Sequence, residues 1–499
     1  MASARPDEAR APAPRPSFRA RLSSGDPGLD EVLGGGFLTG GIYLLVGGPG
    51  SGKTVMANQV CFARAREGGQ CVYVTMVAES HSRLVGNLES FGFFDRTSIA
   101  SKITYLSGAG TLHQGGLPGL FELVEEEVRR RKATLLVLDG FRVGSQTFGA
   151  SAADQTIFLN RLATLLEFSA CTALVCVLAA PGTVMGEYAL ADGLLELSHR
   201  LVGRNAAREL FVSKLRGSKG LAGSHTVEID ESGLCVYPRV EARLARSIRI
   251  PADAKGRAGF GVARFDEMLK GGVPQGSATA VMGAPGAGKT LLGFHFLAEG
   301  ARLEEPGLYF GFYESPERAI HHGEGIGLPV REYVERGLLE FVWERPFENL
   351  NDRLVQRLLA RVEQRKIRRL FIDGLEGFER SRVHARGSYS WLAALTNELR
   401  ALGVTTLISV ESQLLGAHTL PVEPWSALVE NTIALRYVEL RSQLRRLVWI
   451  VKVRGSEFDS SLREFAITKH GFRVAETFES AQAVLSGLAR VVRSERRGT

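Results

Sequence analysis

The amino-acid sequence contains one pattern twice, and this duplication limits the possible folds more than any other feature. The stretch LDEVLGGGFLTG (29–40) returns as FDEMLKGGVPQG (265–276), and the shared register continues into GGPGSGKT (47–54) and GAPGAGKT (283–290). Lys53 and Lys289 are 236 positions apart in a chain of 499 residues. The sequence therefore predicts two similar domains, each about half of the chain.

Four further landmarks recur in the same order, at offsets of 234 to 238 positions: Glu79 with Glu314, Asp139 with Asp373, Lys214 with Lys452, and Arg216 with Arg454. We expect the first domain at residues 21–245 and the second at 246–485, joined near 240–258, where charged residues interrupt the apolar pattern. Residues 1–20 and the basic residues 486–499 are predicted to be a disordered and a flexible tail, because they can bury little apolar area.

Each half alternates short apolar runs with longer segments of helical periodicity. The runs at 42–46, 71–75, 135–138 and 173–178 have the length of buried strands, whereas 121–131 and 154–168 have the period of helices. This alternation is typical of an α/β fold in which helices cover both faces of a mainly parallel sheet.

The composition is that of a soluble globular protein, with 44% hydrophobic and 23% charged residues. No apolar run approaches the roughly 20 residues that span a bilayer, and the first residues lack the apolar core of a secretion signal, so we expect a cytoplasmic protein without membrane contact. The net charge of +7 lies mostly in the tails, because residues 1–21 and 490–499 each contribute +3. The nearly neutral body argues against nucleic acid as a partner.

The two glycine-rich motifs match G-x-x-x-x-G-K-[ST], and each lies between an apolar run and a helical segment, which is the context this motif requires. Backbone N–H groups of such a loop point at phosphate, the lysine neutralises β- and γ-phosphate charge, and the hydroxyl binds Mg²⁺. We therefore predict ATP and Mg²⁺ as ligands, bound by Gly48, Gly50, Ser51, Gly52, Lys53 and Thr54 and by Gly286, Ala287, Gly288, Lys289 and Thr290.

A second group near the metal should end a buried strand, because it reaches the ion from across the sheet. LLVLDG supplies Asp139 and LFIDG supplies Asp373. An aspartate after a strand is also a common turn residue, but recurrence at the matching offset favours the metal-associated interpretation.

Together with these motifs, KLRGS (214–218) and KVRGS (452–456) make the chain resemble the KaiC-type ATPases of the RecA superfamily, over residues 20–485. The resemblance implies two tandem RecA-like P-loop domains, assembly into a hexameric double ring, and ATP held between subunits. It also implies that Lys214 and Arg216, and likewise Lys452 and Arg454, contact the γ-phosphate of a neighbouring subunit's ATP. The alternative is that these cations only end a strand before a turn.

The chain departs from the family where adjacent glutamates are expected, one of them the catalytic base. Here VTMVAES and GFYES leave Glu79 and Glu314 as single acids beside Ala78 and Tyr313. Loss of a positioned base commonly lowers a rate by ~10²- to 10⁴-fold, so we expect slow hydrolysis with retained binding. Glu79 and Glu314 are candidates for the base, or ordinary acids at a strand end.

A second departure concerns autophosphorylation, which in this family occurs on adjacent serine and threonine of the second domain. The matching stretch PWSALVEN retains Ser426 but has Ala427 in place of threonine. Ser426 is therefore either a phosphoacceptor or an ordinary loop serine. His321 and His322 have no further ligand at metal spacing, and we interpret them as a solvated pair in a loop.

These features lead to a first hypothesis of an oligomeric Mg²⁺-ATP-dependent ATPase that acts as a nucleotide-state switch or timer, with a possible serine autokinase activity at Ser426 and a signalling protein as partner. A DNA recombination or unwinding motor is the second hypothesis, because RecA-like domains also drive those processes. The third is a catalytically weak scaffold that binds ATP only for assembly.

Overall fold

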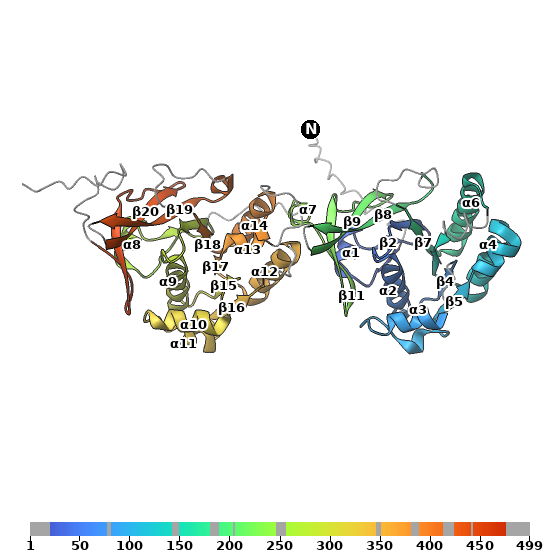
Figure 1. The fold of residues 1–499 in the computed structure, drawn as a ribbon, viewed down its shortest axis with the longest axis horizontal. Helices are drawn as coiled ribbons and strands as arrows, with labels where there is room; N and C mark the ends of the chain where they lie inside the picture. The colour runs from blue at the N-terminus through green and yellow to red at the C-terminus, as the bar shows by residue number, and fades with distance from the viewer. Residues whose placement is uncertain are drawn as a thin grey trace, which may run out of the picture. The chain divides into compact units, whose positions relative to one another are not determined.

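A computed structural model of the chain describes residues 20–76, 81–141, 149–179, 189–202, 205–245, 256–345, 351–380, 389–412, 424–440 and 443–475. The chain divides into two compact units, Met1–Pro238 and Arg239–Thr499. Each unit has its own sheet and its own covering helices (Figure 1). Within the described residues, no helix combines the length and the apolar character needed to cross a membrane.

The first unit alternates strands and helices as its sequence predicts. Its strands are β1 (Arg21–Leu22), β2 (Phe37–Leu38), β3 (Ile42–Gly47), β4 (Cys71–Thr75), β5 (Ile103–Ser107), β6 (Leu135–Asp139), β7 (Thr172–Leu178), β8 (Gly193–Val202), β9 (Asn205–Leu215), β10 (Ser224–Asp230) and β11 (Gly233–Tyr237). Its helices are α1 (Pro27–Val32), α2 (Lys53–Arg66), α3 (His81–Leu88), α4 (Ala109–Arg131) and α6 (Ala152–Ser169).

The second unit repeats this order. Its strands are β12 (Arg257–Ala258), β13 (Val273–Pro274), β14 (Ala278–Gly283), β15 (Gly307–Gly311), β16 (Leu339–Trp343), β17 (Arg369–Asp373), β18 (Thr405–Glu411), β19 (Asn431–Leu440), β20 (Gln443–Val453), β21 (Arg463–Thr468) and β22 (Gly471–Val474). Its helices are α7 (Val240–Leu244), α8 (Ala263–Met268), α9 (Lys289–Arg302), α10 (Pro316–Gly325), α11 (Val330–Glu335), α12 (Asn351–Arg365), α13 (Leu375–Arg380) and α14 (Ser390–Ala401), with a 3₁₀ turn η3 at Pro424–Ala427.

The two main sheets have the same topology. The first has nine strands in the order β11-β10-β9-β8-β3-β7-β6-β4-β5, and the second has nine in the mirrored listing β16-β15-β17-β18-β14-β19-β20-β21-β22. In each, six neighbouring strands are parallel and a hairpin extension is antiparallel. Both sheets are therefore mainly parallel and match two tandem RecA-like α/β domains.

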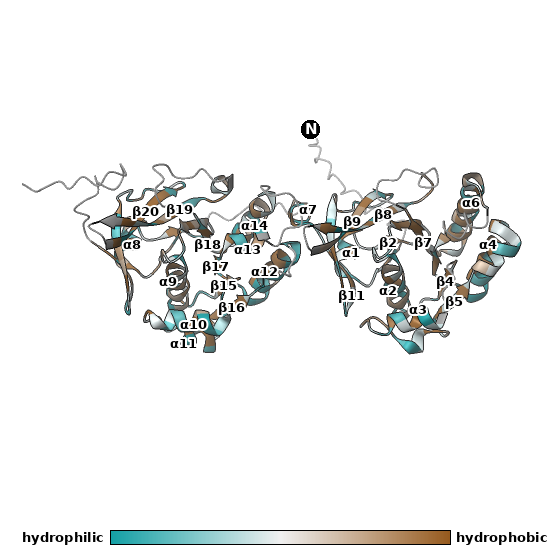
Figure 2. Ribbon diagram, in the orientation of Figure 1, coloured by the Kyte–Doolittle hydropathy of each residue, from teal (hydrophilic) through white to brown (hydrophobic). Residues whose placement is uncertain are grey.

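Helices cover both faces of the second sheet and bury an apolar core on each. One core packs α8, α9, α10 and α11 against the sheet, and the other packs α12, α13 and α14 against its opposite face. Hydrophobic residues dominate α9, whereas hydrophilic residues occupy much of α10 and α12 (Figure 2). The central helix is thus buried and the outer helices are amphipathic, as expected of surface helices.

The central helices fit their sheets through matched residue sizes. In the second unit, a Cβ on Gly293 of α9 would lie 2.2 Å from the ring of Phe371 in β17. The corresponding residues of the first unit are Ala57 and Val137, both fully buried. A larger strand residue is therefore matched by a smaller helix residue, which keeps the core dense without overlap.

A buried side chain of each central helix also anchors the far hairpin. Nε2 of His295 in α9 accepts a hydrogen bond from the backbone N–H of Phe472 at 3.0 Å. In the first unit Gln59 makes the equivalent bond, with Oε1 accepting from the N–H of Leu234 at 2.8 Å. Burial lowers the pKa of His295 from 6.5 to about 4, because the buried ring resists protonation.

This depressed pKa predicts a loss of stability in mild acid. The unfolded chain binds a proton at His295 below about pH 6.5, whereas the folded chain does so only near pH 4, so falling pH favours unfolding across that window. The shift corresponds to about 3 kcal/mol of unfolding free energy, fully present above pH 6.5 and lost as the pH falls to 4. Urea titrations followed by tryptophan fluorescence measure it in the second unit, which contains all four tryptophans.

His295→Gln is the matched control, because it installs the residue that the first unit uses. We expect the unfolding free energy of this variant to fall less between pH 7 and pH 4.5 than that of the wild type. Identical pH profiles for the two proteins would contradict the assignment.

Candidate functional site

The two glycine-rich loops have the same geometry at the ends of β3 and β14. Nζ of Lys53 donates to the carbonyl oxygens of Gly47 and Gly48 at 2.7 and 2.8 Å. Nζ of Lys289 donates to those of Gly283 and Ala284 at 2.8 and 3.0 Å. Burial lowers the pKa of both lysines. Each ammonium group is thus held inside its own loop.

The loop backbones require glycine where they turn into the central helices. Gly52 and Gly288, the residues before α2 and α9, have φ of 107° and 105°, and Gly50 and Gly286 have φ of 70° and 75°. These values lie in the left-handed region that favours glycine. Between them, Ser51 and Ala287 are each 1% exposed, so the loops are packed on their domains while their glycine backbone stays accessible to a ligand.

A hydroxyl and a carboxylate meet at the start of each central helix. Oγ1 of Thr54 lies 3.1 Å from Oδ2 of Asp139, and Oγ1 of Thr290 lies 3.0 Å from Oδ2 of Asp373. The structure therefore brings each predicted metal-associated pair together. Oxygen donors of this kind are the ligands that Mg²⁺ prefers, so the residues present fit that ion.

A tyrosine of the neighbouring strand donates to each of these aspartates. The hydroxyls of Tyr73 and Tyr309 lie 2.7 and 2.9 Å from Oδ2 of Asp139 and of Asp373. Burial and the neighbouring carboxylate raise the pKa of both phenols, so each remains a neutral hydrogen-bond donor. This pair was not predicted from the sequence, although Tyr73 and Tyr309 recur at the repeat offset of 236 positions.

The two sites differ in the residue that the next strand presents to the aspartate. In the second domain, Oγ of Ser409 donates to Oδ1 of Asp373 at 2.7 Å and accepts from the N–H of Gly374 at 2.8 Å. In the first domain, the residue in register with Asp139 is the buried Cys176. Burial raises the pKa of Asp373, which makes donors such as Ser409 important for keeping the carboxylate charged.

Of the two candidate bases, only that of the second domain belongs to the described residues. Glu79 lies outside the described residues. Glu314 lies just beyond the end of β15, and its Oε2 is 3.0 Å from Nδ1 of His322. The adjacent Tyr313 is 52% exposed. The prediction that His321 and His322 lie in a loop was wrong, because α10 continues through both of them as its buried apolar residues pack on the core.

The parallel strands of each sheet have the phosphate loop at their carboxyl ends, and the K-x-R cations lie toward the opposite ends of these strands. Lys214 pairs with Leu194 at the start of β8, whereas Gly47 at the end of β3 is level with Leu197. Three residues of strand separate these levels by ~10 Å. Nζ of Lys214 turns further away and donates to the carbonyl of Ala189 at 2.8 Å. A cation in this position points away from the glycine-rich loop of its own domain.

The second domain repeats this arrangement around the turn that carries Ser426. Nζ of Lys452 donates to the carbonyl oxygens of Ser426 and Val429, both at 2.8 Å. The guanidinium of Arg454 donates to the carbonyl of Ala427 at 3.2 Å, as Arg216 does to that of Ala189 in the first domain at 3.0 Å. Ser426 is half-buried in η3. The cations thus hold the backbone of the candidate acceptor turn.

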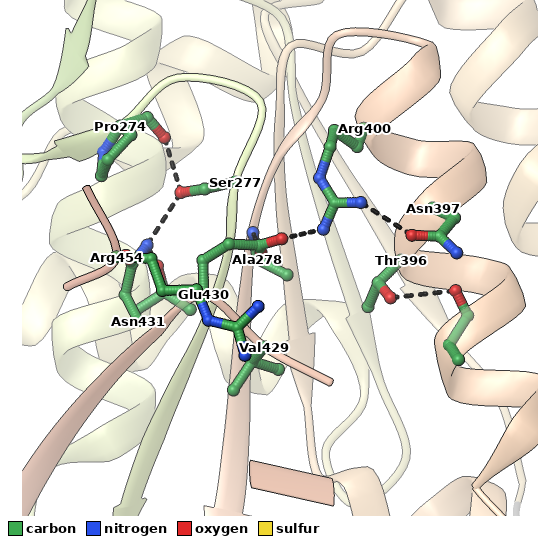
Figure 3. A network of polar contacts seen from close by, with 12 residues as sticks. Pro274, Ser277, Ala278, Thr396, Asn397, Arg400, Val429, Glu430, Asn431 and Arg454 are labelled. Atoms are coloured by element: carbon green, nitrogen blue, oxygen red, sulfur yellow. Dashed lines mark hydrogen bonds and ion pairs between the residues drawn. The ribbon is translucent and has the colours of Figure 1, made fainter. Parts of the chain in front are cut away.

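Glu430 connects this turn to the base of the sheet (Figure 3). Its Oε2 accepts from the N–H of Ala278 at 2.8 Å, and its other oxygen pairs with Arg400 of α14. Arg454 lies beside this pair in Figure 3. Burial, and then the charge of Arg454, lowers the pKa of Arg400. The end of the turn is therefore fixed by a compact charged network.

Comparisons with known proteins agree with this geometry. A family model described as "ATPase: KaiC" matches residues 22–241 and again residues 258–479. The "Circadian clock oscillator protein KaiC 1" of Synechocystis sp. is 27% identical over 473 residues, covering 92% of this chain and 90% of that protein. The proteins of the same name, without the numeral, from Picosynechococcus sp. and Synechococcus elongatus are 26% and 25% identical over 475 and 482 residues, covering 92% and 94% of this chain and 90% and 91% of their own lengths.

The contrast between Ser409 and Cys176 generates a test of the metal site. Ser409→Ala removes a donor to the buried carboxylate of Asp373, so we expect the Mg²⁺ requirement for nucleotide binding in the second domain to rise about 10-fold. Titration of Mg²⁺ against a fluorescent ATP analogue, in a Lys53→Ala background, measures this requirement. Ser409→Cys, which introduces the cysteine found at this position in the first domain, should raise the Mg²⁺ requirement less than Ser409→Ala does. An unchanged Mg²⁺ midpoint in Ser409→Ala would refute the role of the hydroxyl.

Proposed function

Because this chain belongs to the KaiC family of ATPases, we propose that it binds Mg²⁺-ATP in both domains and hydrolyses it slowly as an oligomeric nucleotide-state switch. The observation that carries the proposal is the doubled arrangement of loop lysine, threonine and strand-end aspartate. It recurs in both domains with matching distances. A chance turn motif has no reason to recur with its strand-end partner.

In this proposal the loop residues bind and orient the phosphates. Lys53 and Lys289 exchange their carbonyl contacts for β- and γ-phosphate oxygens, while the N–H groups at the start of α2 and α9 face the same phosphates. Thr54 with Asp139, and Thr290 with Asp373, would hold Mg²⁺. The ion would supply charge neutralisation and in-line orientation of the transferred group.

The hydrolytic step needs a base for the attacking water. A P–O bond forms between the water oxygen and the γ-phosphorus, the bond from that phosphorus to the β,γ-bridging oxygen breaks, and ADP leaves. The proton of the water passes to a carboxylate, for which Glu79 and Glu314 are the candidates. Since each is a single acid, we expect low turnover compared with a site that has two carboxylates.

The K-x-R cations are proposed to complete the site of an adjoining subunit. Lys214 and Arg216 lie toward the sheet edge opposite their own phosphate loop, and Lys452 and Arg454 do the same. A basic group in that position serves a nucleotide better in a neighbouring subunit than in its own. The relatives' family implies a hexamer, and the proposal adopts this state, with a signalling protein as partner and the cytoplasm as location.

Ser426 is the proposed site of autophosphorylation. Its backbone carbonyl is bound by Lys452, so the proposed γ-phosphate contact and the acceptor serine belong to one turn. The serine Oγ would replace water as the attacking group, with its proton passing to the same base and ADP leaving. The fraction of chains phosphorylated at Ser426 would then report ATP turnover in the second domain, as a timer requires.

Single-turnover assays with γ-labelled ATP test the proposal. We expect the wild type to release labelled phosphate, Lys53→Ala and Lys289→Ala each to retain the activity of the other domain, and the double variant to fall ~10²-fold or more. Label on the protein should vanish in Ser426→Ala and in Lys289→Ala.

The double variant is also the baseline for the competing explanation. Phosphate release by the wild type that does not exceed this baseline would mean that the chain is an assembly scaffold that binds ATP without hydrolysing it.

A further inference from the structure

One histidine faces the only candidate base that the described residues contain. Nδ1 of His322 in α10 lies 3.0 Å from Oε2 of Glu314. Oε2 is buried and makes no directed hydrogen bond to any described residue, and the imidazole lies within ion-pair distance of it. Burial raises the pKa of Asp373, hydrogen bonds from its neighbours lower it, and the charge of Glu314 adds a smaller rise. Glu314 is therefore close to the candidate metal carboxylate.

The position of His322 is fixed by the packing of its helix. Ala319, Ile320 and Gly323 form the buried face of α10. A Cβ on Gly323 would lie 2.5 Å from Val330, so α10 contacts the start of α11 closely at the residue next to the histidine. The imidazole thus projects from a rigid part of the domain.

The other acids of α10 have a different partner. Arg331 of α11 pairs with Glu317 at 3.3 Å and with Glu324 at 3.2 Å. Arg331 is therefore engaged by two acids of the helix. Glu314, which precedes the helix, is matched with His322 instead.

The repeat indicates which ring nitrogen matters. Glu314 and His322 correspond, at an offset of 235, to Glu79 and Asn87 of the first domain. The side-chain amide nitrogen of asparagine and Nδ1 of histidine are separated from the backbone by the same number of bonds. Both halves thus place a nitrogen at one position, eight residues after the glutamate. The amide of glutamine would lie one bond further out, near the position of Nε2.

We propose that His322 is a positioning residue that orients the carboxylate of Glu314 toward the γ-phosphate in the second domain. This inference deepens the proposed function and rests on it. The histidine takes the part that a second acid has elsewhere in the family, because Tyr313 occupies that position here. Nδ1 lies within hydrogen-bonding reach of Oε2, so a rotation of the ring that turns its N–H toward this oxygen would let the imidazole hold Glu314 in one rotamer. Unlike a second carboxylate, it would not compete for Mg²⁺.

Four variants of His322 in a Lys53→Ala background separate positioning from packing. His322→Ala and His322→Gln should lower the single-turnover rate about 10-fold, the effect of losing one hydrogen bond to a charged group. His322→Asn should restore the rate to within about 3-fold, because its amide nitrogen replaces Nδ1. His322→Leu, which preserves bulk without a donor, should be as slow as His322→Ala. Energy transfer from tryptophan to a fluorescent ATP analogue, and urea unfolding, should be unchanged in all four variants.

The outcomes distinguish this inference from the function on which it rests. If turnover in the Lys53→Ala background is not abolished by Lys289→Ala, the proposed second-domain ATPase itself fails. If that turnover depends on Lys289 but His322→Ala equals the parent, or His322→Asn is as slow as His322→Gln, the positioning role is wrong. If any variant loses nucleotide binding together with folding, the pair is structural and the inference is likewise overturned.

Discussion

The parallel sheet dictates where the chemistry of each domain lies. Because β3, β4 and β6 run in the same direction, the phosphate loop, the strand that precedes the candidate base and Asp139 all end at one edge of the sheet. The same holds for β14, β15 and β17. Buried strands therefore bring an aspartate beside a lysine and a hydroxyl of the glycine-rich loop, from which it is far apart in the chain.

The direction of the strands also separates the K-x-R cations from the phosphate loop of their own domain. Strands β9 and β20 run antiparallel to their neighbours, so Lys214 and Lys452 near their ends lie toward the edge from which β8 and β19 begin. A domain built this way has its glycine-rich loop at one end of the parallel strands and the K-x-R cations toward the other end. In the proposed assembly, the cations of one chain would meet the glycine-rich loop of another, and the turn with Ser426 would then adjoin a nucleotide held by that other chain.

Much of the fold and part of the candidate site could be predicted from the repeat, because the constant spacing of the landmarks shows which strand ends and loops correspond in the two halves. The strands, the two domains and the encounter of Thr54 with Asp139 follow from buried apolar runs and their flanking motifs. The contributions of Ser409 and Cys176 could not be predicted, because cross-strand register depends on how long β7 and β18 are and where they start. The location of His322 was misjudged for a related reason: a pair of polar histidines suggests a loop unless the buried Ile320 and Gly323 beside it are recognised as a helix face.

The central claim is that each nucleotide is completed by basic groups from an adjoining subunit, which makes assembly depend on ATP. Light scattering of the purified chain with and without Mg²⁺-ATP tests this claim most directly. The account predicts that Mg²⁺-ATP converts the protein to one discrete multiple of the chain mass, and that replacing Lys214, Arg216, Lys452 and Arg454 together by alanine prevents this. A wild-type protein that keeps the mass of a single chain at saturating Mg²⁺-ATP would contradict it.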